Sequence, residues 1–258
     1  MLREPTMEQV QAMQWHAFAA AWREQGQQPD VHAMAFDERL GLLVDAEWTA
    51  REARRLTRRL QEAKLKLPQA CVEGVECAAG RGLEKREVRA MATCGWVREH
   101  QNVVLTGATG TGKTYVACAL GQQACRKGFR ALYRRATRLT DELTLARADG
   151  TLGRVLERFA RVDVLVIDDW VHAPLKDQER RDLLELLDDR YGTRSTILTS
   201  QVPIANWHEA LGDPTHADAI CDRLLHNAHK FVLQGPSRRK EANRVMNELA
   251  SGEGVQGE

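Results

Sequence analysis

Gly107-Ala108-Thr109-Gly110-Thr111-Gly112-Lys113-Thr114 is the stretch of sequence that decides the fold of this chain. It fits the pattern G-x-x-x-x-G-K-[ST], whose glycines let the backbone curl until its N–H groups point at phosphate oxygens. Residues 103–105 before it predict a strand, and residues 115–120 after it predict a helix whose positive end faces the same anion. We expect a nucleoside triphosphate to contact Gly107, Thr109, Gly110, Thr111, Gly112, Lys113 and Thr114.

The chain downstream of residue 83 alternates between short strands rich in valine, leucine and isoleucine and longer helical segments. Such alternation predicts a parallel sheet with helices on both faces, an α/β fold in which nucleotides bind at the carboxyl ends of the strands. The expected strands are 103–106, 130–133, 163–168, 195–199 and 229–233. The expected helices are 114–126, 137–147, 177–190 and 215–225.

Two carboxylates follow a buried strand beyond the phosphate loop. The apolar residues 164–167 precede Asp168 and Asp169, which is the Walker B arrangement. We expect Asp168 and Thr114 to hold Mg²⁺ and Asp169 to orient the water that attacks ATP. Gln201 ends the next strand, where an amide can hold that water or the γ-phosphate. The predicted chemistry is therefore hydrolysis of ATP with Mg²⁺ as cofactor.

Residues 1–80 are expected to form a helical domain, residues 81–250 an ATPase domain and residues 251–258 a disordered tail. Pro29-Asp30 separates two helical patterns, and Thr49-Ala50-Arg51-Glu52 matches a capping box, which predicts a new helix starting at Thr49. That helix is strongly basic. A solvated helix face and a surface for DNA phosphates both explain the charge. The residues concerned are Arg51, Arg54, Arg55, Arg58 and Arg59.

Composition bounds the remaining possibilities. The 258 residues carry a net charge of +1 and have 43% hydrophobic content, enough for a core. No apolar run is long enough to cross a membrane, and the N-terminus lacks a signal-peptide core. The six cysteines form no C-x-x-C pair, which favours reduced thiols in the cytoplasm. His208 and His216 lie across a proline turn without a cysteine partner, so we expect structural roles for them.

The motifs Asp168-Asp169, Thr199-Ser200-Gln201 and Asp222-Arg223-Leu224 together resemble the AAA+ ATPases in the branch of the DnaC helicase loader. The residues Trp207-His208-Glu209-Ala210-Leu211-Gly212-Asp213-Pro214-Thr215, with the segment 222–229, are closer still to the IstB-like family. That family consists of helper ATPases of insertion-sequence transposases. The resemblance runs from about Glu38 to Lys240.

The resemblance implies the AAA+ strand order, ATP-dependent self-assembly, binding of duplex DNA with little sequence preference, and a cognate transposase as partner. It implies a reduced or absent helical lid, with room for one helix over about 238–249 and with Arg239 as the sensor arginine by position. Arg134, Arg135 and Arg138 follow the strand at Tyr133 and are weaker DNA candidates.

One late arginine leaves two roles open. Arg223 cannot easily reach the nucleotide of its own subunit, so it could serve a neighbour as an arginine finger, or it could pair with an acid such as Asp222. Two other functions also stay open. A DnaC-like helicase loader would use the same motifs, and a small-molecule kinase would use the same phosphate loop, although no acceptor pocket is evident.

Overall fold

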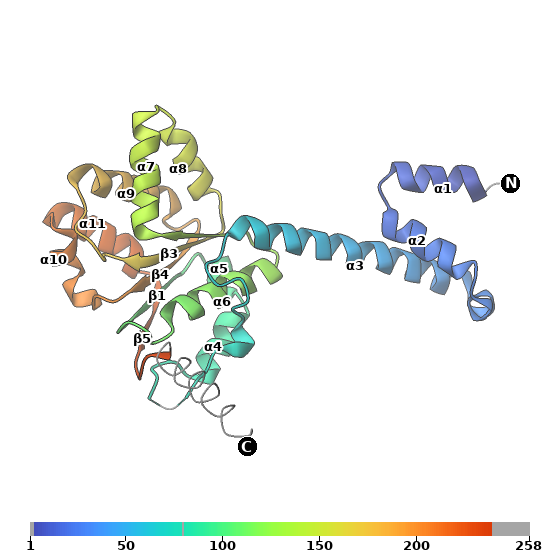
Figure 1. Cartoon of the computed structure of the whole chain (residues 1–258), viewed down its shortest axis with the longest axis horizontal. Coiled ribbons are helices and arrows are strands. Elements are labelled where there is room, and N and C mark those ends of the chain that lie inside the picture. Colours follow the sequence, from blue (N-terminus) through green and yellow to red (C-terminus); the bar gives the residue numbers. More distant parts are fainter. Residues whose placement is uncertain (1–2, 79, 239–258) are drawn as a thin grey trace, which may run out of the picture. The chain divides into compact units, whose positions relative to one another are not determined.

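The computed structural model describes residues 3–78 and 80–238 (Figure 1). The predicted tail, the helix expected over 238–249 and Arg239 lie outside these residues, apart from Arg238. The chain divides into two compact units that meet between Arg58 and Arg59. The sheet-bearing unit thus begins before the predicted boundary at residue 80. No helix in the described part of the chain has the length and apolarity needed to cross a membrane.

The first unit is helical, as predicted. A small core of Val10, Phe18, Ala19 and Leu43 holds its helices together. Pro29 starts a short 3₁₀ helix where the break was expected. The elements are α1 (Arg3–Ala12), α2 (His16–Gln25), η1 (Pro29–Ala33) and α3 (Phe36–Ala63), the last of which continues into the second unit.

The helix start expected at Thr49 is wrong, because α3 runs without interruption from Phe36 to Ala63. A capping box acts only where the residue before it has left the helical conformation. No proline occurs within α3, and its only glycine is Gly41, so no residue near Thr49 breaks the helix. The capping pattern therefore lies in the middle of a long helix.

The second unit is built on a five-stranded parallel sheet, as predicted, with strand order β2-β3-β4-β1-β5. All five expected strands and all four expected helices are present within two residues of their predicted ends. The strands are β1 (Asn102–Gly107), β2 (Ala131–Arg135), β3 (Val164–Trp170), β4 (Ser195–Ser200) and β5 (Ala228–Leu233). The helices are η2 (Val72–Gly74), α4 (Lys85–Ala92), α5 (Gly95–Arg98), α6 (Lys113–Arg126), α7 (Ala136–Ala148), α8 (Leu152–Ala160), α9 (Asp177–Arg190), η3 (Ile204–Asn206), α10 (Trp207–Leu211) and α11 (Pro214–Leu225).

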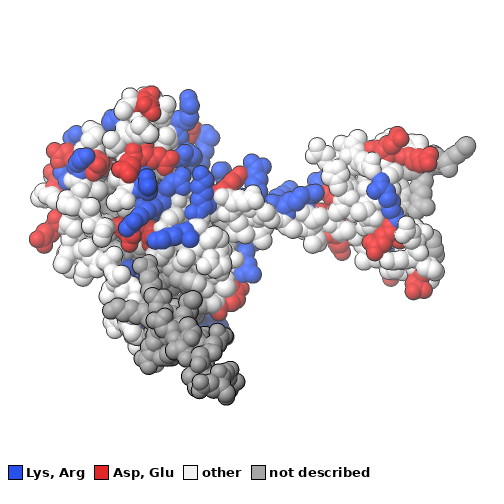
Figure 2. Space-filling model, in the orientation of Figure 1, with Lys and Arg blue, Asp and Glu red and all other residues white. Residues whose placement is uncertain are grey.

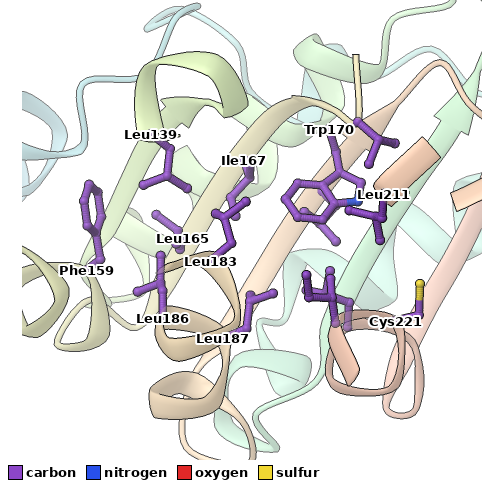
Figure 3. Close-up of a cluster of buried hydrophobic side chains, with 14 of the residues drawn as sticks. Leu139, Phe159, Leu165, Ile167, Trp170, Leu183, Leu186, Leu187, Leu211 and Cys221 are labelled. Atoms are coloured by element: carbon purple, nitrogen blue, oxygen red, sulfur yellow. The ribbon is translucent and has the colours of Figure 1, made fainter. Parts of the chain in front are cut away.

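Strand β3 shows how the sheet is covered on both faces. Leu165 and Ile167 belong to the main core with residues of α7, α8 and α9 (Figure 3). Val166 points the other way, toward Gly121 of α6, as the two-residue repeat of a strand requires. Burial on both faces explains why the strand is a continuous apolar run.

The last residues of α3 and the segment after it pack against α6. Ala63 and Leu65 are buried, and Leu65 lies so close to Gly121 that a side chain there would touch it. The Arg59 guanidinium also donates to the carbonyl of Cys125, the penultimate residue of α6. This packing carries the chain to Lys66, beside the carboxyl end of β3.

Candidate functional site

The phosphate loop joins the carboxyl end of β1 to the amino end of α6. Gly107, Gly110 and Gly112 have φ values of 141°, 87° and 99°, which side chains other than glycine rarely adopt. A Cβ on Gly107 would lie 2.1 Å from the carbonyl oxygen of Leu233 in β5. Glycine is therefore required here by the backbone conformation and by the neighbouring strand.

Lys113 is the first residue of α6 and is 6% exposed. Its ammonium donates to the carbonyls of Gly107 and Ala108, 2.8 Å away in each case. The charge is thus held within the curl of the loop, where the motif places phosphate. Thr109, at the tip of the loop, donates to Oε1 of Gln201 at 2.6 Å. The structure therefore brings the predicted amide to the predicted loop.

Asp168 is completely buried at the end of β3. Its Oδ1 accepts hydrogen bonds from Thr114, at 2.8 Å, and from Thr199, at 2.6 Å. Its Oδ2 accepts from Tyr133 at 2.7 Å and from the Lys66 ammonium at 3.4 Å. Donors from four different segments thus converge on one carboxylate.

Burial by itself would raise the pKa of Asp168, but the hydrogen bonds from Thr199, Tyr133 and Thr114 outweigh it. The pKa of this carboxyl therefore lies below its ordinary value. The same burial, together with the bond to Asp168, raises the pKa of the Tyr133 phenol. Asp168 is consequently ionised at neutral pH, as a metal ligand must be.

The residues present fit a magnesium ion. Asp168 and Thr114 offer the hard oxygen donors that Mg²⁺ prefers, and their oxygens already lie 2.8 Å apart. A Cβ on Gly110 would collide with the side chain of Ser237, so glycine leaves the room that this close approach to the loop needs. Sequence reasoning named both oxygen donors but missed Tyr133, Lys66 and the hydroxyl of Thr199, which reach Asp168 from other segments.

Asp169 has an unusual backbone. Its φ is +59°, and the pairing of β3 with β4 shifts register between Ile167 and Trp170. Its N–H donates to Oγ1 of Thr199 at 3.1 Å, and its carboxylate lies 2.9 Å from Nε of Arg135. The carboxylates of the two adjacent acids therefore face different partners, although both residues bond Thr199. Arg135, a DNA candidate by sequence, instead pairs with Asp169.

A small cleft that was not foreseen from the sequence adjoins the phosphate loop. It is lined by Val75, Leu83, Tyr115 and Leu233, with Arg238 at its rim. The N–H of Arg238 donates to the carbonyl of Gly110 at 3.0 Å, and its guanidinium pairs with Glu76. The cleft encloses only about 20 Å³, and charged side chains, among them Glu76 and Arg81, line it together with apolar ones. Arg238 is the neighbour of the predicted sensor, Arg239, which lies outside the described residues.

Arg223 lies near the amino end of β1, at the end of the sheet opposite to the phosphate loop. Asn102 begins β1 and donates its amide to the carbonyls of Arg223 and Leu224 at 3.1 and 3.2 Å, whereas the phosphate loop follows the far end of β1. The six residues of β1 place the two ends of the strand about 20 Å apart. The Arg223 guanidinium pairs with Asp188 of α9, not with Asp222. It is therefore out of reach of its own nucleotide loop.

Several of the arginines that were predicted to contact DNA already form ion pairs within the first unit. Arg51 and Arg54 lie 2.7 and 3.2 Å from the same oxygen of Glu47. Arg55 lies 2.6 Å from Glu52. The helix therefore carries less uncompensated charge than its sequence indicates. Arg58 belongs to the same unit, and the exposed Arg138 lies on α7 of the second.

A basic cleft runs along β2, an outer strand of the sheet. Figure 2 shows Lys and Arg side chains gathered on one face of this unit. Arg134, in the cleft, pairs with Glu142 at 3.0 Å and lies over the ring of Phe159. Of the predicted DNA residues, the cleft contains Arg59 and Arg134. Its charged lining residues are Arg59, Glu62, Lys64, Arg130, Arg134 and Arg158.

The two histidines considered from the sequence have separate partners. His216 lies 2.8 Å from Asp213, which also accepts its backbone N–H and so caps α11. His208 lies 2.9 Å from Asp218. Among the described residues, no group of three or more acidic, histidine or cysteine side chains could hold a metal. The six cysteines are all free.

Comparison with known proteins identifies relatives of this chain. The family described as IstB-like ATP binding protein matches residues 8–245. The insertion-sequence ATP-binding protein y4pL of Sinorhizobium fredii is 43% identical over 95% of this chain and 99% of its own length. The ATP-binding protein of insertion sequence IS1162 from Pseudomonas fluorescens is 48% identical over 79% of this chain and 88% of its own.

Solved structures agree on the fold. The DnaI structure covers 70% of this chain and all of its own, with 20% identity and a TM-score of 0.58. The DnaC helicase loader covers 64% of this chain and 97% of its own, with 20% identity and a TM-score of 0.54. The fold is thus that of an AAA+ protein, with the expected sheet. On its sequence match, its AAA+ fold and its phosphate loop, the chain belongs to the IstB-like ATP-binding protein family.

Proposed function

We propose that this protein hydrolyses ATP and, assembled on duplex DNA, helps the transposase of an insertion sequence to engage its target. Hydrolysis controls assembly and disassembly. The observation that carries the proposal is the convergence of Lys113, Thr114 and Asp168 beneath the loop, with Arg223 placed at the far edge of the sheet. That arrangement leaves the site incomplete within one subunit.

The residues have distinct tasks in hydrolysis. Lys113 leaves its carbonyl partners to neutralise the β- and γ-phosphates, and Asp168 and Thr114 hold Mg²⁺, which stabilises the charge of the leaving group. Asp169 accepts the proton of the attacking water, and Gln201 fixes the water or the γ-phosphate from the next strand. Arg239, the residue after Arg238 in the sequence, is the candidate sensor of the nucleotide.

Arg223 completes the site of a neighbouring subunit in this proposal. An arginine finger stabilises charge on the transferred phosphoryl group, and it must be held in place by its own subunit. The pairing of Arg223 with Asp188 and its contact with the carbonyl of Ala219, at 2.9 Å, supply that support. Assembly and hydrolysis are thereby coupled.

Binding of DNA rests on the basic cleft along β2 and on the basic part of α3. Phosphate contacts carry no base information, so little sequence preference follows. Residues 1–80 serve assembly, DNA or partner binding, and residues 81–250 serve ATP hydrolysis. The names of the relatives refer to insertion sequences, which supports a transposase as the partner. Six free cysteines suit the reducing cytoplasm.

The shared site is tested by mixing two inactive variants. Arg223→Ala is expected to bind ATP but not to turn it over, and Lys113→Ala is expected to bind poorly. A mixture of both contains interfaces with an intact loop on one side and an intact Arg223 on the other, so partial ATPase activity returns. Asp222→Ala, at the neighbouring position, is the matched control and keeps activity. If the two variants co-assemble but their mixture recovers no ATPase activity, that result would contradict an Arg223 finger that acts between subunits.

The DNA surface is tested by salt titration of duplex binding with ATP present. Each lost phosphate contact flattens the log–log slope by about 0.9, so a triple variant loses up to about 2.7. Comparing two variants with equal charge change separates the cleft from the helix. These are Lys64→Ala/Arg130→Ala/Arg158→Ala and Arg54→Ala/Arg55→Ala/Arg58→Ala. Unchanged slopes in both would show that neither surface holds DNA.

The partner is tested by asking which protein raises the rate of hydrolysis on DNA. Stimulation by a cognate transposase is expected, because the target complex must be released once it has been used. Stimulation by a replicative helicase instead would indicate a helicase loader. Phosphate transfer to a metabolite would indicate a kinase.

A further inference from the structure

Lys66 contacts Asp168 but has no task in the proposed hydrolysis. Its Nζ lies 3.4 Å from Oδ2 of Asp168, although 102 residues separate the two in the sequence. The other three donors to this carboxylate are neutral hydroxyls, whereas Lys66 brings a full positive charge. That charge compensates a carboxylate that is completely buried.

The two oxygens of Asp168 have different surroundings. Oδ1 accepts from Thr114, which is expected to hold Mg²⁺ together with Asp168, and Oδ2 accepts from Tyr133 and Lys66. An ammonium and a divalent cation at one carboxylate repel each other, and little solvent is present around a buried carboxylate to screen the repulsion. The binding of Mg²⁺ and the contact with Lys66 therefore oppose each other.

Lys66 is a partner that can leave the carboxylate. Its side chain is 41% exposed, and a lysine has a flexible stem of four carbons, so the ammonium can exchange the carboxylate for water. Tyr133 stays 2.7 Å from Oδ2 and keeps the carboxylate in position. Lys113 differs, because it is buried and two carbonyls hold its ammonium. Lys113 is thus fixed within the loop, whereas Lys66 can be released.

The backbone beside Lys66 is strained. Lys64 follows the last residue of α3 and has a φ of 50°, a left-handed conformation that residues other than glycine rarely adopt. Such a conformation persists only where the surrounding contacts impose it. On its carboxyl side, Leu65 is buried against Gly121, and Lys66 is tied to Asp168. Loss of the second contact weakens the constraint on Lys64.

Lys66 also lies close in sequence to the end of a helix that both units share. Helix α3 ends at Ala63, and the chain divides into its two units between Arg58 and Arg59, within that helix. A movement of Lys66 therefore acts on the last turn of α3. The contact with Asp168 thus connects the metal site to the segment that enters the second unit.

We propose that Lys66 and Mg²⁺·ATP compete for Asp168, so that the lysine holds the carboxylate until metal and nucleotide bind and its release frees the segment that follows α3. The inference rests on the proposed function, because it takes Asp168 to be a ligand of Mg²⁺. Lys66 thereby lowers the affinity for metal-bound nucleotide. The end of α3 consequently responds to the metal and not to the nucleotide alone, and departure of the metal with the product restores the contact.

The first test titrates the full-length protein with a non-hydrolysable ATP analogue by calorimetry, without DNA and at a series of Mg²⁺ concentrations. Lys66→Met keeps the length of the side chain and removes its charge. The Mg²⁺ concentration that gives half of the full tightening of analogue binding should fall about tenfold or more, the effect of one lost contact with a charged group. Lys66→Arg keeps the charge and should stay close to the parent.

Lys85→Met is the matched control for this titration. Lys85 begins α4, is exposed and makes no ion pair within the described part of the chain, so its substitution removes the same charge without touching Asp168. Equal Mg²⁺ requirements of Lys66→Met and the parent, or a higher requirement of the variant, would refute the competition while the metal site stands. Analogue binding by the parent that does not depend on Mg²⁺ would refute the metal site at Asp168, and the proposal with it. Circular dichroism verifies that each variant is folded.

The second test uses the parent protein and needs no substitution. Brief acetylation, read by mass spectrometry, compares Lys66 with Lys64, which is exposed in the same segment and makes no ion pair among residues 3–78 and 80–238. Contact with the carboxylate shields the amine, so Lys66 should react more slowly than Lys64 in the protein alone and with the analogue in EDTA. Mg²⁺ and the analogue together should raise the rate at Lys66 several-fold. A rate that is equal in all three conditions, or that falls when Mg²⁺ is added, would overturn the proposal.

Discussion

Thr199 joins the two acids of the site through a single buried hydroxyl. It donates to Asp168 at 2.6 Å and accepts the N–H of Asp169 at 3.1 Å. Thr199→Val keeps the shape and removes both hydrogen bonds. A bond to a carboxylate contributes about 1.5–3 kcal/mol and a neutral one about 0.5–1.5, so we expect a loss of about 2–4 kcal/mol in the free energy of unfolding.

The loss should depend on pH in a defined direction. Because the folded pKa of Asp168 lies below its ordinary value, its hydrogen bonds stabilise the protein above the unfolded pKa and are lost as pH falls through the folded one. The difference between Thr199→Val and the parent should therefore be full at pH 7 and shrink below about pH 4, the ordinary range of an aspartic acid.

Urea unfolding at a series of pH values measures the effect, and the ATPase rate at saturating Mg²⁺ reports its consequence for turnover. Thr199→Ser is the matched control, because it keeps the hydroxyl and should remain close to the parent in both measurements. Equal stability of the valine and serine variants at pH 7 would refute the view that this hydroxyl holds the two acids.

Three further outcomes are expected. Lys113→Ala should lower ATP turnover about a hundredfold or more in a phosphate-release assay, and parent-like turnover would contradict the assignment of the loop. Gly107→Ala should abolish ATP binding in a calorimetric titration and weaken the sheet, because its Cβ would lie 2.1 Å from the Leu233 carbonyl oxygen; normal binding would show that the loop can yield. Glu47→Ala removes the acceptor of the N–H groups of Ala17 and Phe18, at 2.9 and 3.2 Å. Hydrogen exchange at these two amides should quicken about five- to thirtyfold, the equivalent of a lost helix cap, and unchanged exchange would exclude that role.

Much of the sheet-bearing unit was predictable, because its signals are local. The runs 103–105 and 164–167 are apolar along their whole length, as strands buried on both faces must be. The helix α8 was missed although a turn at Gly150, with a φ of 68°, separates it from α7, because a turn signal does not say whether the residues after it are helical. The error at Thr49 has a similar origin, because a short capping motif gives no information about whether the preceding residues are already helical.

The residues of the site likewise divide into those that local sequence motifs reveal and those that they do not. Lys113, Thr114 and Asp168 belong to short motifs and were identified from spacing. Lys66 and Tyr133 reach the same carboxylate from segments distant in sequence, and no pattern near either residue announces the contact. The pairing of Arg135 with Asp169 was likewise invisible, since an exposed arginine after a strand is equally suited to phosphate or to an acid.

Within residues 3–78 and 80–238, strand β1, which carries the phosphate loop, pairs only with β4 and β5, the two strands that come last in the sequence. A ribosome releases about 5–20 residues per second, so roughly 6–25 s pass between the synthesis of Gly107 and that of its partner Leu233. Until β4 is made, the nascent loop has no neighbouring strand to shape it, and the apolar residues of β1 lack their final cover until β5 follows. Binding of ATP is therefore closed to the growing chain, and early termination before β5 yields a product that exposes an aggregation-prone strand.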